Sequence, residues 1–179
     1  MQRIAQFYKV SEEQFMKDMD GMYVQVSGSR FIKLGESDIR QAYRNIELPR
    51  RATSGSAGYD FFSPVSFMLK PGESILMPTG IRVRIDDGWV LKLYPRSGFG
   101  FKYRLQLDNT VGIIDADYFS SDNEGHIMAK LTNCSMDGKI LKVPEKIGFV
   151  QGIFLPFGVT VDDDVDAVRN GGFGSTSNK

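Results

Sequence analysis

The sequence has very few of the residues that disulfides, zinc clusters and histidine-based active sites require. Among 179 residues there is one cysteine, Cys134, and one histidine, His126. A single cysteine cannot form a disulfide within the chain, and this pair is a poor basis for a structural zinc site. We expect Cys134 to be a small, partly buried residue near a strand end. Because His126 follows the acidic loop Asp122–Gly125, we expect it to be a surface residue.

The chain also lacks net charge and long apolar runs. It has 22 basic and 22 acidic side chains. That balance argues against a general nucleic-acid binder, although a few Arg and Lys residues could still form a phosphate site. No apolar run approaches the ~20 residues that cross a bilayer, and the amino terminus has no apolar signal core. We therefore expect a cytoplasmic protein that binds neither nucleic acid nor membrane.

Residues 1–45 have the patterns of a small α/β extension. The run Ser11-Glu12-Glu13-Gln14 is a capping box, which predicts a helix from about Glu12 to Met19. Short strands are predicted at Tyr23–Val26 and Arg30–Leu34, followed by a helical turn or two over Ser37–Tyr43. The segment has no catalytic constellation, so we interpret it as a structural or partner-binding extension.

From residue 46 the pattern changes to short β segments. Ile81, Val83 and Ile85 alternate with polar residues, as do residues 127–132. Turn pairs such as Pro71-Gly72 and Asp137-Gly138 separate these segments. Many short strands with frequent turns predict an all-β sandwich, jelly roll or barrel over residues 46–165. Residues 166–179 are glycine-rich and are expected to form a mobile carboxy-terminal arm.

One stretch, Gly112–Tyr118, places two carboxylates and a tyrosine after strand-type residues. Asp115 follows two β-branched residues, so it should lie at the end of a buried strand. A carboxylate partly removed from water is a candidate general base. Taken alone, however, the stretch reads better as a solvated turn, because a motif is a hypothesis until its context is found.

Four further stretches are each weak evidence. Ala57–Asp60 places a carboxylate beside a strand start, and Pro95–Gly98 combines Arg, a hydroxyl and a glycine amide as a plausible phosphate grip. Gln151 is the polar residue of an apolar strand, where a ligand or a backbone carbonyl would be its partner. Arg169–Ser177 has the glycines, hydroxyls and phenylalanine of an arm that could order on a nucleotide.

Together and in this order, the five stretches resemble the five motifs of the trimeric deoxyuridine triphosphatase (dUTPase) family, of bacterial or phage type. The resemblance covers roughly residues 46–177. It implies a jelly-roll-like β-clip fold and a homotrimer with sites between subunits. It also implies hydrolysis of dUTP to dUMP and pyrophosphate with Mg²⁺, which limits uracil incorporation into DNA and supplies dUMP. For a phage-encoded protein, the location would be the host cytoplasm.

The resemblance also implies a role for each matching residue. Asp115 would activate the attacking water, Tyr118 would lie under the deoxyribose, and Asp60 would contact the metal through water. The base would be read by a hairpin carrying Asn109, Ile113 and Ile114, with a further backbone contact at Met128. The phosphates would be bound by Arg96, Ser97, Gly98 and Gln151, and by the tail residues Arg169, Ser175 and Thr176, while Phe173 would cover the uracil.

Three departures from the family pattern affect individual contacts. An insert, Phe119–Glu124, stands where the family has a single residue, which lengthens the loop beside the sugar. Gly148 occupies the usual basic position before Gln151, unless Lys146 substitutes for it. Arg169 stands one residue closer to the glycine pair than is usual.

Alternative functions remain open at this point. A deoxycytidine triphosphate deaminase shares the fold class but needs a different catalytic set. A nucleotide-gated module could bind a protein partner through residues 1–45 or the insert at 119–124. A structural jelly roll of the capsid type is a further alternative that would not need the five motifs.

Overall fold

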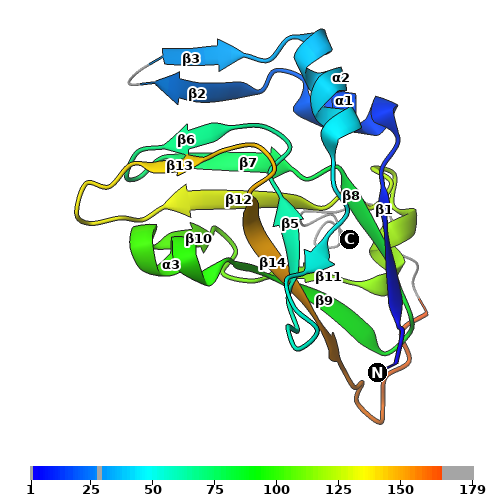
Figure 1. Cartoon of the computed structure of the whole chain (residues 1–179). Helices are drawn as coiled ribbons and strands as arrows, with labels where there is room; N and C mark the ends of the chain where they lie inside the picture. Colours follow the sequence, from blue (N-terminus) through cyan, green and yellow to red (C-terminus); the bar gives the residue numbers. More distant parts are fainter. Residues whose placement is uncertain (1, 28–29, 167–179) are drawn as a thin grey trace.

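The computed structural model describes residues 2–27 and 30–166 and is built mainly of β-strands (Figure 1). The helices are α1 (Glu12–Met19), α2 (Glu36–Asn45), α3 (Ser97–Tyr103) and a 3₁₀ helix, η1 (Ala116–Ser120). The strands are β1 (Ala5–Lys9), β2 (Tyr23–Ser27), β3 (Arg30–Lys33), β4 (Arg50–Arg51), β5 (Tyr59–Phe62), β6 (Phe67–Leu69), β7 (Ser74–Pro78), β8 (Ile81–Ile85), β9 (Trp89–Pro95), β10 (Leu105–Leu107), β11 (Gly112–Ile114), β12 (Met128–Asn133), β13 (Leu141–Val143) and β14 (Gly148–Pro156).

The main sheet contains five strands in the order β11-β9-β14-β5-β4. A second sheet has the order β10-β12-β7, and three strand pairs, β1-β8, β13-β6 and β2-β3, complete the β structure. Every pairing is antiparallel. This arrangement agrees with the predicted all-β, jelly-roll-like fold carrying a small α/β extension.

The alternation of apolar and polar residues in β8 correctly predicts which side chains of the strand are buried. Ile81, Val83 and Ile85 are buried, whereas Arg84 on the other face is exposed. This burial lets one face of the strand enter the core while the other remains wet. In β9, Val90 is buried in addition to Leu91 and Leu93, so this strand inside the main sheet is covered on both faces here.

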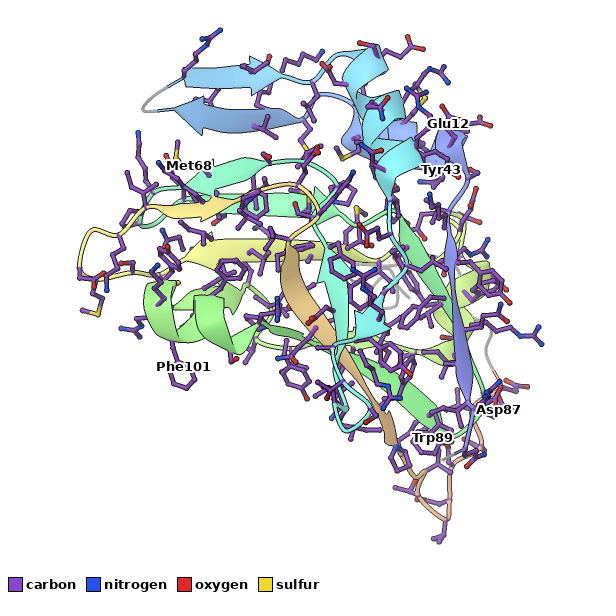
Figure 2. The ribbon with its side chains drawn as sticks, in the orientation of Figure 1. Glu12, Tyr43, Met68, Asp87, Trp89 and Phe101 are labelled. Atoms are coloured by element: carbon purple, nitrogen blue, oxygen red, sulfur yellow. The ribbon has the colours of Figure 1, made fainter. Side chains whose placement is uncertain are left out.

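The helices of the extension form as the sequence predicts. The side chain of Ser11 accepts a hydrogen bond of 3.0 Å from the amide of Gln14, which satisfies one of the first free amides of α1. Arg40 of α2 then joins the two helices through an ion pair of 2.7 Å to Glu12, and it also pairs over 2.8 Å with Glu36 of its own helix. In Figures 1 and 2 the two helices lie together above the β part of the chain.

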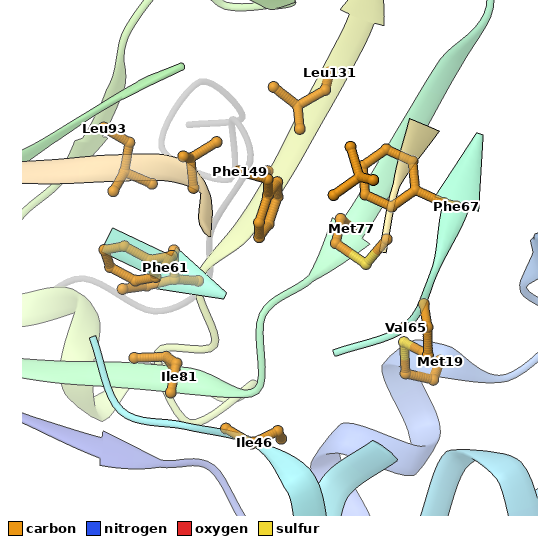
Figure 3. Packing of buried hydrophobic residues seen from close by; sticks show 14 of the residues in the cluster. Met19, Ile46, Phe61, Val65, Phe67, Met77, Ile81, Leu93, Leu131 and Phe149 are labelled. Atoms are coloured by element: carbon orange, nitrogen blue, oxygen red, sulfur yellow. The ribbon is translucent and has the colours of Figure 1, made fainter. Parts of the chain in front are cut away.

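The extension shares its core with the β part of the chain. Met19 of α1 and Ile46, just after α2, belong to the same apolar cluster as Phe61 and Phe149 (Figure 3). Strand β1 is also hydrogen-bonded to β8 along its whole length, from Ala5 opposite Ile85 to Lys9 opposite Ile81. The division at residues 45 and 46 stays a prediction, but the two segments do not pack independently.

The expectation that His126 lies on the surface is wrong. Its side chain is fully buried, and Asp18 of α1 lies 2.5 Å from its Nδ1. The acidic loop before it does not carry it outward, because helix α1 covers this position. Cys134 is partly buried just after β12, as expected. No helix among residues 2–27 and 30–166 is long and apolar enough to cross a bilayer.

Candidate active site

The residues predicted to bind phosphate meet at one end of the main sheet. Asp60 of β5 stands opposite Gln151 of β14, which in turn stands opposite Tyr94 of β9. Arg96 follows β9 directly, and its Nε lies 3.1 Å from Oδ1 of Asp60. The Asp60 side chain is 16% exposed and that of Arg96 is 43% exposed. Three segments that are far apart in the sequence therefore place one carboxylate, one guanidinium and one amide side by side.

The side chain of Gln151 lies against the backbone of Gly58. A Cβ added at Gly58 would lie 2.6 Å from Oε1 of Gln151, so any other residue here would push the end of that side chain aside. Nε2 of Gln151 donates to the carbonyl of Pro95 over 3.4 Å, so the backbone partner weighed from the sequence is present. The Gln151 side chain is half-buried, beside Asp60 and Arg96.

Ser97 and Gly98 begin helix α3 and are exposed. The first amides of a helix have no acceptor within the helix, so their N–H groups can face an anion. Arg96, in the N-cap position, accepts with its carbonyl from the amides of Phe99 and Gly100 at 3.0 and 2.9 Å. The loop is therefore fixed by its own helix while its first two residues remain accessible.

The proposed base and the residues for uracil gather around β11. This strand pairs with β9, with Ile114 opposite Leu91, and Asp115 follows as the N-cap of η1. Ile113 is 50% exposed, whereas Ile114 is half-buried. Asp115 follows the strand as expected, but the expectation of a buried strand is wrong, because only Gly112 of the three β11 residues is buried.

Asn109 and Met128 are brought to the same region. The turn carrying Asn109 places Thr110 at φ 68°, and the amide of Asp108 donates over 3.0 Å to the carbonyl of Lys130 in β12. Met128 starts the same strand two residues earlier. Strands β10 and β11 on either side of this turn enter different sheets rather than pairing with each other. The expected hairpin is thus a turn that passes from one sheet to the other.

Tyr118 is held within this region by its hydroxyl. The residue is 6% exposed, and its hydroxyl donates over 2.9 Å to the carbonyl of His126. Asn123 of the insert donates from Nδ2 to the same hydroxyl over 2.8 Å. The hydroxyl of Tyr118 is therefore fixed at His126, which lies two residues before Met128, the start of β12.

Asp115 lines an open hollow of about 750 Å³. Its other polar walls include Asp86, Asp87, Asp117 and Arg84. Four carboxylates with a single guanidinium form a poor site for a triphosphate, since like charges repel at these distances. The cations that a triphosphate needs must come from elsewhere.

Arg96 of the same chain lies too far away to supply them. Ile114 pairs with Leu91, so Asp115 lies at the start of β9, whereas Arg96 follows its end. At ~3.3 Å per residue, the two residues stand roughly 20 Å apart along the strand. Figure 2 shows this span: Trp89 marks the first end, and Phe101 of α3 marks the region beyond the second.

Comparisons with known proteins agree on one family. Residues 44–177 match the family model described as dUTPase. The chain is 38% identical over 150 residues to a deoxyuridine 5′-triphosphate nucleotidohydrolase of Lactococcus lactis, covering 81% of this chain and 99% of the relative. The chain belongs to the dUTPase family.

Solved dUTPase structures have the same fold. The dUTPase of Streptococcus mutans superposes with a TM-score of 0.56 at 38% identity, covering 63% of this chain and 88% of that one. A dUTPase from phage phi11 of Staphylococcus aureus, described as showing a species-specific insert, gives a TM-score of 0.56 at 24% identity, with 69% and 91% covered. The predicted family, fold class and enzyme class are thereby confirmed.

The structure explains one departure from the dUTPase pattern. At Gly148, an added Cβ would lie 3.1 Å from Nη1 of Arg96 and 3.3 Å from Cβ of Asp60. A side chain at this position would crowd the Arg96–Asp60 pair, which would have to shift by a few tenths of an ångström. Lys146 is exposed in a turn at φ 62°. The tail residues Arg169, Phe173, Ser175 and Thr176 lie outside the described residues.

The donor set near the phosphate cluster fits Mg²⁺ held mainly by substrate. The described residues contain no group of three His, Cys, Asp or Glu side chains that could hold a metal. Mg²⁺ in nucleotide enzymes is bound through one or two carboxylates together with phosphate oxygens and waters. Asp60, with its carboxylate at the edge of the cluster, suits that arrangement.

Several supporting residues gave no signal in the sequence. Gly58 and Gly148 lie against side chains of the phosphate cluster. Asn123 holds Tyr118, five residues before it, and Asp18 holds His126 from 108 residues away. An Ala-Gly or Asn-Glu-Gly run is common in turns, and only the folded chain shows what lies beside it.

Proposed function

We propose that the chain forms a homotrimer that hydrolyses dUTP to dUMP and pyrophosphate at sites shared between subunits. The observation that carries this proposal is the distance between Asp115 and Arg96, which lie at opposite ends of β9. A general base must be within ~3 Å of its proton, directly or through one water. Both residues can serve one α-phosphate only when two subunits meet.

The reaction is attack of water on the α-phosphorus. Asp115 takes a proton from the water, the new O–P bond forms, and the bond to the bridging oxygen breaks so that pyrophosphate leaves. Charge developing on the phosphate oxygens is stabilised by Arg96, by the amides of Ser97 and Gly98, and by Gln151. The 3.1 Å contact with Asp60 orients the Arg96 guanidinium for this task.

Mg²⁺ belongs with the triphosphate in this proposal. Asp60 is the residue that would contact it through water. When bound, the ion would neutralise charge on the phosphate oxygens and orient them. No cage of protein ligands is needed, because phosphate oxygens and waters would hold most of the ion.

Recognition of the nucleoside is assigned to the region around β11. Asn109 and the main chain of Ile113 and Ile114 would read the edge of uracil, with a further backbone contact at Met128. Tyr118 would form the wall under the deoxyribose. The residues beyond 166 would complete the site: Phe173 over the base, and Arg169, Ser175 and Thr176 on the terminal phosphate. Closure of such an arm would exclude water from the site.

The substrate assignment is tested by incubating the protein with each dNTP, UTP and Mg²⁺ and measuring pyrophosphate. We expect release from dUTP alone. Absence of turnover with dUTP, or equal turnover of UTP, would overturn the proposal. Ammonia release from dCTP would show a deaminase instead.

The shared site is tested by mixing two inactive variants. Asp115→Asn and Arg96→Ala subunits are unfolded, combined and refolded together. Sites that take Asp115 from one subunit and Arg96 from another regain function, so we expect about a quarter of the wild-type activity from random mixing. Each variant refolded alone is the control, and a mixture no more active than these controls would contradict a shared site.

Two further assignments accompany this function. Free nucleotide is the substrate, so we place the enzyme in the cytoplasm, or in the host cytoplasm if a phage encodes it. Protein binding through residues 1–45 or 119–124 stays a prediction. It is supported by the exposed Tyr23 and Phe31 on the β2-β3 hairpin, at 59% and 53% exposure. Because this hairpin lies far from β9 (Figure 1), Phe31→Ser should leave dUTP turnover unchanged.

A further inference from the structure

The hydroxyl of Tyr118 is held from two sides by residues that no family motif includes. We infer that Asn123, His126 and Asp18 are positioning residues for Tyr118, and that through it they set the discrimination between dUTP and UTP. The inference rests on the proposed function, in which the Tyr118 ring forms the wall under the sugar. It assigns a role in that site to the insert and to helix α1 of the extension.

Asn123 closes a small ring of hydrogen bonds around the tyrosine. Its Nδ2 donates to the Tyr118 hydroxyl over 2.8 Å, and its Oδ1 accepts from the amide of Gly125 over 3.2 Å. The Tyr118 hydroxyl donates onward to the carbonyl of His126 over 2.9 Å. Both hydrogen-bonding roles of the hydroxyl are thus satisfied, and rotation of the ring would break both bonds.

His126 is itself fixed, which makes its carbonyl a firm anchor. The side chain is fully buried, and its Nε2 accepts from the amide of Gly80 over 2.7 Å. The ring proton therefore resides on Nδ1, which donates to Oδ2 of Asp18 over 2.5 Å. Gln14 donates to the same oxygen over 2.7 Å, so Asp18 is held on helix α1 as well.

The amino-terminal end of helix α1 also contacts the insert, through Ser11. The amide and the hydroxyl of Ser11 donate to the two carboxylate oxygens of Glu124 over 2.8 and 2.5 Å. Arg82 of β8 lies 3.8 Å from the same carboxylate and stacks over the ring of Phe119, with 3.7 Å to its centroid. The segment from Phe119 to His126 is thereby fastened to α1 at two points and to β8 at a third.

Rigidity of this kind matters for substrate choice. A wall excludes an added hydroxyl only if it cannot move aside, because a yielding hydrophobic surface rejects such an analogue weakly. Loss of one neutral hydrogen bond shifts an equilibrium by about three- to tenfold. Loosening Tyr118 should therefore raise the UTP:dUTP ratio of kcat/KM by about that factor, mainly through a lower KM for UTP.

The experiment measures kcat and KM for dUTP and UTP in wild type and five variants. Asn123→Ala removes both contacts of the amide. Asn123→Asp keeps the acceptor for Gly125 but replaces the donor to Tyr118 by an acceptor, which competes with the carbonyl of His126 for the single hydroxyl proton. We expect both to raise the UTP:dUTP ratio about three- to tenfold. In a Tyr118→Phe background, which has no hydroxyl to hold, Asn123→Ala should add little, since effects through one contact are not additive. Asp122→Asn, at the exposed neighbouring position, is the matched control and should leave the ratio unchanged.

The same measurement tests Asp18. Asp18→Ala removes the acceptor for His126, whereas Asp18→Asn keeps one, so the second variant should restore most of the discrimination lost in the first. Unchanged ratios in Asn123→Ala and Asn123→Asp, or additive effects with Tyr118→Phe, would overturn the inference. Failure of the wild-type chain to hydrolyse dUTP would instead overturn the proposed function. Equal melting temperatures for Asn123→Asp and wild type ensure that a change in ratio reports on the site.

Discussion

The Oδ1 atom of Asp60 lies 3.1 Å from Nε of Arg96, and this contact joins the Ala57–Asp60 stretch to the Pro95–Gly98 stretch. Gly148 leaves the room that this pair occupies. Because both side chains are partly exposed, the pair contributes less than ~1 kcal/mol to folding. Its larger effect is on where the guanidinium points.

Asp60→Asn should therefore separate stability from activity. We expect the free energy of unfolding to change by less than ~1 kcal/mol. The kcat/KM for dUTP should fall about 10- to 100-fold, because a small displacement of Arg96 misaligns the phosphate. Urea unfolding and steady-state kinetics check the two effects. Asp137→Asn, which breaks the surface pair with Lys139, is the control and should leave kcat/KM unchanged.

Asp115→Asn should abolish turnover without abolishing binding. Loss of a general base costs about 10²- to 10⁴-fold in kcat, whereas the amide keeps the size of the side chain. Pyrophosphate release measures the first effect, and calorimetric titration with dUTP measures the second. Asp117→Asn is the matched control and should keep most of the turnover, because Asp117 is an exposed acid two residues further along, in η1. A retained rate in Asp115→Asn would refute the assignment of the base.

Gly125→Ala should unfold the loop beside Tyr118. Gly125 has φ 67°, and an added Cβ would lie 2.5 Å from the carbonyl oxygen of Tyr118 and 2.8 Å from Cα of Phe119. The left-handed backbone and the backbone clash together should cost about 3 kcal/mol or more. Gly138 has a similar φ of 74° with no atom within 4 Å of the added Cβ. Gly138→Ala should therefore cost only the conformational penalty, roughly 1–2 kcal/mol. Equal losses in urea unfolding would contradict the clash.

The Asp18–His126 contact should make part of the free energy of unfolding depend on pH. Burial acts to raise the pKa of Asp18, but hydrogen bonds from His126 and Gln14 outweigh it and lower the pKa. A carboxylate with a lowered folded-state pKa stabilises the fold above its unfolded value of about 4. That contribution is lost as the pH falls through the folded value.

Asp18→Asn should accordingly be less stable than wild type at neutral pH. The difference in unfolding free energy should stay constant above about pH 5 and shrink below about pH 4. Urea denaturation at a series of pH values measures it. Glu13→Gln, an exposed position on the same helix, should show no such narrowing. A difference that widens in acid would contradict the sign.

The parts of the fold that depend on local patterns were predicted well. The cap at Ser11 sets the start of α1, and the alternation in β8 gives the correct buried face. The order of the motifs also identified Asp60, Arg96 and Gln151 as neighbours before any strand pairing was known, and the registers of β5, β9 and β14 bring them together.

What could not be predicted depends on contacts between distant segments. His126 was expected at the surface because its neighbours in the sequence are acidic, yet it is covered by Asp18, 108 residues away. Ser11 and Glu124 are separated by 113 residues. Local periodicity carries no information about such pairs, because they are fixed only when β1 pairs with β8 and lays helix α1 beside the insert.

In the proposed homotrimer, the placement of Asp115 and Arg96 at opposite ends of β9 would make activity depend on protein concentration. A single folded subunit would hold half of each of two different sites and complete neither. Dilution to concentrations at which the subunits dissociate should therefore abolish dUTP turnover, while the circular dichroism spectrum stays that of the folded chain. A cell that produces few copies would gain activity more steeply than in proportion to the amount of protein made.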